Sequence, residues 1–153
     1  MKKNLTDRYP VEELPDDEDD GTMPGSVQAL RNQVVGQRIV NVENAYAEYE
    51  HPDWSFTDRG HGLVLTLDNG KKVFVADTND CCAYTQVDNF LLNAEHVDHV
   101  ITGVGTTEGY TRWHIYADYG DMLQLEVGWS AGNPFYYGYG FDIAVIEDYE
   151  VTK

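Results

Sequence analysis

Alternation of apolar and polar residues is the strongest structural signal along the chain, and it predicts mainly β-strands. The run GLVLTLDNGKKVFVAD (62–77) holds two β-rich segments separated by Asn69-Gly70, a pair typical of the two-residue type I′ hairpin turn. We therefore predict a β-hairpin in this run. With that turn, the residues that share one face are Leu63, Leu65, Leu67, Phe74 and Ala76.

Similar alternation predicts a strand over residues 38–46 and several more from about residue 97 onward. Residues 47–60, rich in charges and turn formers, are predicted to be a long loop between the first strand and the hairpin. Around the turn DYGD, two strands are expected to place one set of large side chains in the core. This set is Trp113, Ile115, Leu123, Leu125, Val127 and Trp129.

Two segments have the spacing of short helices. Ser26 is a suitable N-cap for the first, Gly36 is placed to end it, and Val27, Leu30 and Val34 form its apolar stripe. In the second, QVDNFLLN, Thr85 and Asp88 resemble a capping box, and the expected anchors are Val87, Phe90 and Leu91. The predicted fold class is therefore α+β and β-rich, a mostly antiparallel sheet of about seven strands with two short helices.

The first 24 residues differ from the rest in composition. They combine prolines with the acidic run DDEDD and few apolar residues, so they bury too little surface to offset chain entropy. We predict a disordered acidic arm over residues 1–24 and a single β-rich domain over residues 25–153. The length of 153 residues suits one domain with a real core.

The net charge of -17 changes what partners the protein can have. Such a surface repels phosphates and anionic lipids, which disfavours direct binding to nucleic acid or to a membrane, and it attracts basic protein surfaces. The alternative, that the charge serves solubility alone, stays open. No apolar run has the length of a membrane span, and Lys2 and Lys3 are not followed by the apolar region of a secretory signal. We expect a cytoplasmic protein.

The stretch GNPFYYGYGFD (132–142) crowds aromatic rings beside glycines. Alternation places the rings on one face and Gly138 and Gly140 on the other, so a neighbouring Trp113 or Trp129 could cover the glycines. Packing is the favoured interpretation, and a flat ligand ring lying there is the alternative. If a binding site exists, its candidate residues are Arg112, Trp113, His114, Trp129, Tyr137, Gly138, Tyr139 and Gly140.

The segment NDCCAYT carries the other unusual residues. Cys81 and Cys82 are adjacent, so a disulfide between them would be strained, and we expect reduced, mainly structural thiols. A catalytic cysteine with a histidine as its base is a less favoured alternative, and the candidate bases are His96, His99, His114 and His61. The spacing of these four residues does not suit a zinc site, and no nucleotide, metalloprotease or hydrolase motif is present in the sequence. We predict no metal and no cofactor.

Several longer segments resemble a family of small proteins of unknown function from actinobacterial viruses and their hosts. These segments are GLVLTLDNG, DCCAYTQVDNFLL, DHVITGVGTTEGYTRWHIYADYGDMLQLEVGW and GNPFYYGYGF, and the resemblance covers about residues 34–147. It implies a virus-encoded accessory protein that acts in the host cytoplasm, and it carries no catalytic residues over.

Together with the charge, this resemblance favours a non-enzymatic protein that binds and inhibits a basic host protein of defence or DNA handling. The most specific form of this hypothesis is that the acidic surface mimics the negative charge of DNA and occupies a basic site of the host protein. The alternatives are a binder that sequesters a nucleotide-like small molecule, a small cysteine-dependent enzyme, and a structural protein of the virion.

Overall fold

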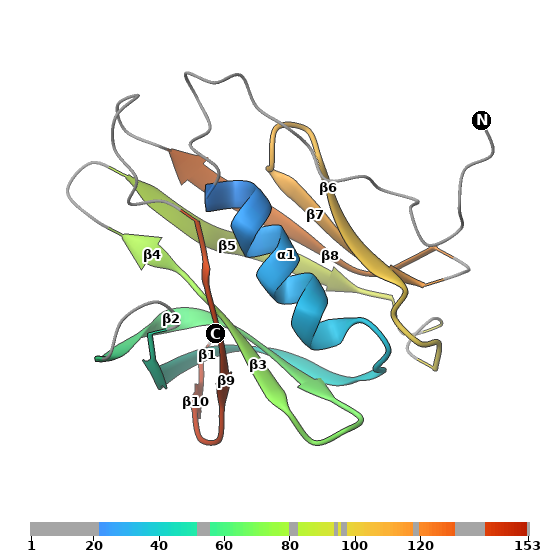
Figure 1. Ribbon diagram of the computed structural model, residues 1–153, viewed down its shortest axis with the longest axis horizontal. Helices are drawn as coiled ribbons and strands as arrows, with labels where there is room; N and C mark the ends of the chain where they lie inside the picture. Colours follow the sequence, from blue (N-terminus) through green and yellow to red (C-terminus); the bar gives the residue numbers. More distant parts are fainter. Residues whose placement is uncertain are drawn as a thin grey trace.

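The computed structural model describes residues 22–51, 56–79, 83–93, 95, 98–117, 120–130 and 140–152. Within these residues the chain forms one helix and two antiparallel five-stranded sheets, shown in Figure 1. Sheet A has the strand order β10-β1-β2-β3-β9, and sheet B has the order β4-β5-β8-β7-β6. The elements are α1 (Thr22–Val34), β1 (Ile39–Glu50), β2 (Thr57–Leu67), β3 (Lys72–Ala76), β4 (Thr78–Asn79), β5 (Tyr84–Leu92), β6 (Gly103–Thr107), β7 (Arg112–Ala117), β8 (Gly120–Ser130), β9 (Asp142–Ile146) and β10 (Glu150–Val151).

The main hydrophobic core lies between the two sheets and is closed by α1. Sheet A contributes Leu65 and Val73 among others, sheet B contributes Trp113 and Leu125, and the helix adds its apolar stripe. Figure 1 shows α1 lying across the space between the sheets. The stripe consists of Met23, Val27, Leu30 and Val34, all fully buried.

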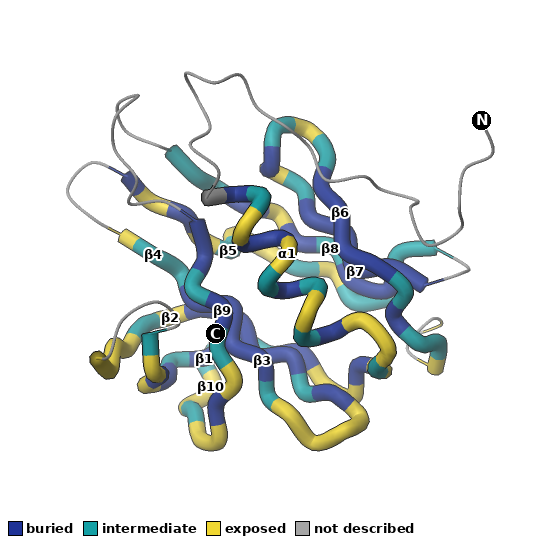
Figure 2. The backbone as a smooth tube through the Cα atoms, viewed as in Figure 1, coloured by how far each residue is buried: buried dark blue, intermediate teal, exposed yellow. Residues whose placement is uncertain are grey.

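A second, smaller cluster lies on the opposite face of sheet A. It includes Val64 and Phe74, whose sequence neighbours face the main core, so β2 and β3 are buried on both faces. Figure 2 shows this burial along β3. The other buried members are Ala45, Ala47, Tyr49, Ala76 and Ile146. Residues 63–65 and 73–76 therefore form continuous apolar runs instead of strict alternation.

The hairpin prediction is confirmed for its strands but wrong for its register. The N–H of Leu67 donates to the carbonyl of Lys71 at 2.9 Å, which leaves a three-residue loop, and Gly70 alone in that loop has a positive φ, 87°. Loops of this kind end in a left-handed glycine, whereas a type I′ turn needs positive φ at Asn69 as well. Compared with a two-residue turn, the extra loop residue shifts the pairing of β2 with β3 by one position. The three leucines consequently share the main core with Val73 and Val75, while Phe74 and Ala76 point the other way.

We expect replacement of Gly70 by valine to destabilise the protein by roughly 1–2 kcal/mol, because a β-branched side chain resists positive φ. Nothing lies within 4 Å of a Cβ built at this position, so crowding does not contribute. Urea unfolding of Gly70→Val beside Gly70→Asn measures the effect, since asparagine tolerates this conformation better. Equal losses for the two variants would contradict the assigned loop geometry.

The predicted second helix is wrong, because residues 84–92 form strand β5. The pairing of β5 with β8 shifts by one residue between Val87 and Asn89, which marks a β-bulge at Asp88. The bulge separates the inward-facing Val87 and Phe90 by three residues instead of two, and this is the spacing of a helix. Thr85, predicted to cap the helix, is a fully buried strand residue.

Other boundaries also differ from expectation. Strand β1 continues to Glu50 and β2 begins at Thr57, so most of the predicted loop 47–60 is a strand pair. The helix begins at Thr22, so residues 22–24 belong to it and not to the predicted arm, and Ser26 lies inside it instead of capping it. Gly36 follows the helix with a φ of 90° as expected. Residues 1–21 of the predicted arm lie outside the described residues. The β-rich, antiparallel character of the fold is confirmed; the count of about seven strands and two helices is not.

Candidate functional site

The outer face of sheet B, the face turned away from the core, carries an ordered array of polar residues. Directly paired residues of antiparallel strands share a face, so the register defines rows across the sheet. One row runs Asn89, Glu126, Arg112 and Thr107, and the next runs Leu91, Gln124, His114 and Gly105. The rows between them point inward and contain Phe90, Leu125 and Trp113. This face therefore combines charge with a rigid backbone.

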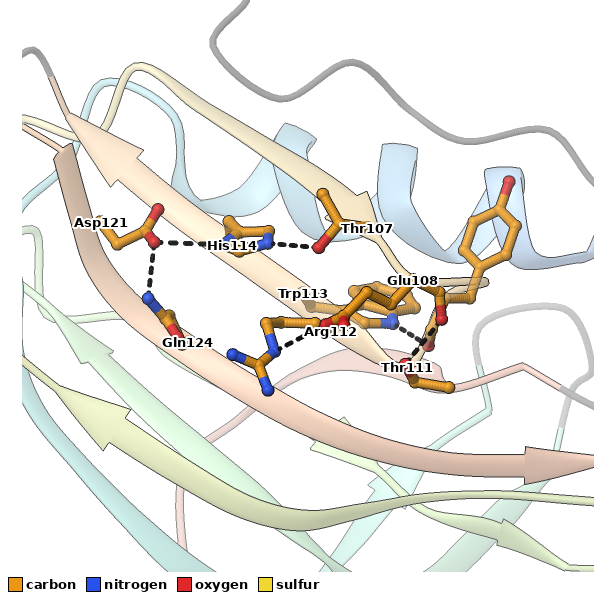
Figure 3. Close-up of polar contacts among 9 residues, drawn as sticks. Thr107, Glu108, Thr111, Arg112, Trp113, His114, Asp121 and Gln124 are labelled. Atoms are coloured by element: carbon orange, nitrogen blue, oxygen red, sulfur yellow. Dashed lines mark hydrogen bonds and ion pairs between the residues drawn. The ribbon is translucent and has the colours of Figure 1, made fainter.

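His114 is the centre of a hydrogen-bonded chain on this face, drawn in Figure 3. Its Nε2 lies 2.8 Å from the hydroxyl of Thr107, and its Nδ1 lies 3.1 Å from a carboxylate oxygen of Asp121. Gln124 donates to the same oxygen at 2.6 Å. A neutral imidazole protonated on Nδ1 satisfies both contacts, with the Thr107 hydroxyl as donor to Nε2.

The order hydroxyl, imidazole and carboxylate is that of a triad that activates a hydroxyl. His114, however, is only 5% exposed and lies in the middle of a strand, which leaves little room for a substrate. The contacts instead join β6, β7 and β8 through side chains, in addition to their backbone ladders. We therefore conclude that these hydrogen bonds have a structural role, holding β6, β7 and β8 together on the outer face of sheet B.

The turn between β6 and β7 is left-handed at three successive residues, with φ of 59° at Glu108, 65° at Gly109 and 61° at Tyr110. The two non-glycine residues cost roughly 1–2 kcal/mol each in this conformation. A side chain donates to each of the three carbonyls and offsets that cost. The donors, in order, are Thr111 Oγ1 (2.6 Å), Trp129 Nε1 (2.9 Å) and Trp113 Nε1 (2.9 Å).

Exposed carboxylates and one arginine lie together at this side of sheet B. Glu108 forms an ion pair with Arg112 at 3.2 Å, Glu126 lies opposite Arg112 in the register, and Asp88 projects from the β5 bulge. One oxygen of Asp88 lies only 2.7 Å from where a Cβ at Gly128 would sit. We call Asp88, Glu126, Glu108 and Arg112 the acidic face. Its flanking residues on β5 are the exposed Tyr84, Gln86, Asn89 and Leu91.

Every arginine in the described residues already has a partner within the protein. Arg38 pairs with Asp68 at 3.4 Å, Arg59 pairs with Glu48 at 2.9 Å, and Arg31 donates to the carbonyl of Val104 at 2.7 Å. The exposed ion pairs of Arg38 and Arg59 add little to stability, but each places a carboxylate beside the guanidinium. The described arginines therefore offer anionic ligands little uncompensated charge, and the other described cations are Lys71 and Lys72 at the β2–β3 hairpin.

The aromatic and glycine candidates behave as packing residues where the structure describes them. Trp113 is 0% exposed and meets the ring of Phe141 edge-on, with centroids 5.2 Å apart, so it is a core residue. Trp129 is half-buried against Tyr110. Gly140 has a φ of 103° and is held at both ends, since its N–H donates to Thr85 and its carbonyl accepts from Thr78. The remaining candidates Tyr137, Gly138 and Tyr139 lie outside the described residues.

Of the catalytic candidates, Cys81, Cys82 and His96 also lie outside the described residues. His99 is half-buried in a turn between β5 and β6. In the part of the chain that the structure describes, no group of three or more His, Cys, Asp or Glu residues is placed to hold a metal ion. Within the same residues, no helix is both long enough and apolar enough to cross a membrane.

A second polar cluster joins the end of β1 to the start of β9. The hydroxyl of Tyr49 donates to Asp142 at 2.7 Å, and His51 Nε2 lies 3.4 Å from the other carboxylate oxygen. Burial raises the pKa of Tyr49 strongly, and the hydrogen bond to Asp142 adds to the increase. Tyr49 therefore stays a neutral donor that holds Asp142 in place.

Sequence reasoning singled out His114 and Arg112 but missed the residues around them. Thr107 and Asp121 each lie seven residues from His114, and only the two hairpins bring all three together. Asp88 was assigned to a helix cap, and its place on the acidic face depends on the bulge. A sequence signal for Glu126 was present, since it alternates with the apolar residues of β8.

Among the comparisons with known proteins, only the comparison with family models gives a match. No curated protein and no solved structure matches the chain. A family model does match residues 32–143, which run from the second half of α1 to the second residue of β9 and include the whole acidic face. The chain belongs to the family described as a domain of unknown function (DUF7448).

Proposed function

We propose that the protein is a virus-type accessory protein that binds a host protein with a basic surface through the acidic face of sheet B, and so inhibits it. The observation that carries the proposal is the arrangement of Asp88, Glu126 and Glu108 beside an arginine that is already ion-paired. Charge on a rigid sheet is pre-organised, so little entropy is lost when a partner binds.

The overall charge supports the same class of partner. A net charge of -17 raises the rate of encounter with a basic surface and disfavours nucleic acid as a direct ligand. Proteins that handle DNA, including those of host defence, carry basic sites of this kind. In its finer form, the proposal is that the acidic face occupies such a site in place of DNA, in the host cytoplasm.

The nucleotide-binding alternative receives less support from the described residues. Trp113, a candidate ring for stacking, is fully buried, and Arg112, a candidate cation for phosphate, is already paired with Glu108. Cys81 and Cys82, on which the enzyme alternative is built, lie outside the described residues. We therefore keep binding to a basic protein as the leading function.

A charge-neutralising variant tests the proposal. Asp88→Asn, Glu126→Gln and Glu108→Gln, combined in one chain, should weaken capture of the host partner about tenfold, because exposed charge pairs contribute roughly 0.2–1 kcal/mol each. The matched control combines Glu147→Gln, Asp148→Asn and Glu150→Gln on the exposed end of sheet A. Both variants lose the same charge, so a difference between them measures the site. Binding is measured at low and high salt against purified partner.

Two results would contradict the proposal. Equal loss in both variants would mean that overall charge, and not the acidic face, attracts the partner. A nucleotide that co-purifies with the native protein, together with partner binding that is indifferent to salt, would favour the small-molecule alternative.

A further inference from the structure

Asp77 lies where the chain crosses from sheet A to sheet B, between β3 and β4. Its backbone N–H donates to the carbonyl of His61 on β2 at 2.9 Å. Its side chain turns toward the other sheet, where Oδ1 accepts the backbone N–H of Val87 on β5 at 3.0 Å. One residue therefore ties the two sheets together.

The Val87 end of this tie adjoins the acidic face. Val87 is the last regular residue before the bulge, and the bulge directs Asp88 over Gly128 on the outer face of sheet B. Gln86, the residue before Val87, donates to Asp88 at 2.8 Å. The position of the Asp88 carboxylate thus depends on a backbone segment that Asp77 holds.

Asp77 also has unusual electrostatics for a carboxylate. Burial raises its pKa to about 6, while the hydrogen bond from Val87 and the nearby His61 oppose this shift and Asp88 adds to it. The titratable groups that act on it are thus His61 from β2 and Asp88 from β5. Ordinary carboxylates are fully ionised well below this pH, so acidification to about 5 changes Asp77 before it changes them.

We propose that Asp77 is a positioning residue that makes the acidic face sensitive to pH, an inference that rests on the proposed function. Near neutral pH the ionised carboxylate makes a charge-assisted hydrogen bond to Val87 and adds negative charge behind Asp88. On acidification it takes up a proton, the hydrogen bond weakens and that charge disappears. Binding of a basic partner therefore weakens between pH 7.5 and 5.

Stability should move in the opposite direction. The folded-state pKa lies above that of the unfolded chain, so the contribution of Asp77 to stability is complete below about pH 4 and is lost as the pH rises through about 6. A general loss of structure in acid would lower binding and stability together. The opposite signs distinguish regulation by Asp77 from simple acid damage.

The test uses NMR and a defined probe. In the native protein, the Val87 amide proton should titrate with a midpoint near pH 6, and in Asp77→Asn, which keeps an oxygen acceptor for Val87, it should not. The probe is a ten-residue lysine peptide, whose affinity should fall about two- to fivefold more between pH 7.5 and 5 for the native protein than for Asp77→Asn. Asp148→Asn, on the far sheet, is the control and should behave like the native protein. His61→Gln should still show a titration at Val87, with its midpoint moved upward because His61 lowers the pKa of Asp77, and this result separates Asp77 from the histidine.

The two proposals fail in different ways. If the peptide shifts no resonance of Asp88 or Glu126, the acidic face is not the binding surface and the proposed function is wrong. The peptide could instead bind there while the chemical shift of the Val87 amide proton does not change between pH 5 and 7.5, or changes equally in Asp77→Asn. In that case the proposed role of Asp77 is wrong.

Discussion

Replacing Gly62 with alanine is expected to remove most of the stability of the protein. A Cβ at this position would clash with the carbonyl oxygen of Val75 and would lie 2.9 Å from both Ala76 Cα and Phe74 Cε1. Two of these atoms belong to the backbone of β3 and cannot move without breaking the β2–β3 ladder. We expect a cost on the order of 3 kcal/mol or more, above ordinary overpacking, against a typical total of about 5–15 kcal/mol.

Gly60 on the same strand is the matched control, because nothing lies within 4 Å of a Cβ built there. Thermal and urea unfolding of Gly62→Ala and Gly60→Ala should show a large loss for the first and a change within about 0.5 kcal/mol for the second. Similar curves for the two variants would mean that β2 and β3 do not approach each other as described.

Trp113→Ala is expected to cost about 3–5 kcal/mol, the range for truncation of a buried large aromatic residue. The ring is fully buried against Phe141, and its indole N–H holds the carbonyl of Tyr110 in the left-handed turn. The variant therefore loses core packing and one of the contacts that offset the strain of the turn. Urea unfolding measures the loss, and near-ultraviolet circular dichroism reports the packing of the remaining rings.

Trp129→Ala is the control for this variant, since Trp129 donates a similar hydrogen bond to Gly109 but is only half-buried. Its stability should fall clearly less. If Trp113→Ala instead unfolds like the native protein and no longer binds the partner, Trp113 belongs to a binding site and the packing assignment is wrong.

The strands could be predicted from the sequence, but their exact pairing could not. Alternation identified β7 and β8 and the side chains that they bury, including Trp113 and Leu125. In the β2–β3 hairpin, one additional loop residue reversed the faces of Phe74 and Val75, and turn propensity alone does not distinguish a two-residue from a three-residue loop. Local pattern therefore predicts which elements form more reliably than how they align.

The candidate site was predicted less completely, because its geometry is created by irregularities. The bulge in β5 gives residues 87–90 a helical spacing and also directs Asp88 outward. The contacts of His114 depend on the register of the β6–β7 and β7–β8 hairpins, and the residues next to His114 in the sequence do not determine that register. Charge, by contrast, is read directly from the sequence, and the acidic character of the site follows from it.

The burial of β2 and β3 on both faces has a consequence for how the protein opens. Residues on these strands alternate between two hydrophobic clusters, with Leu63 and Leu65 in one and Val64 in the other. Because β2 and β3 contribute to both clusters, exposing one cluster to water also removes these strands from the other cluster. Local fluctuations therefore stop at the edges of the sheets, and the central ladder opens only in global unfolding. We therefore expect sheets A and B to unfold as one cooperative unit and not as two halves joined at Asp77.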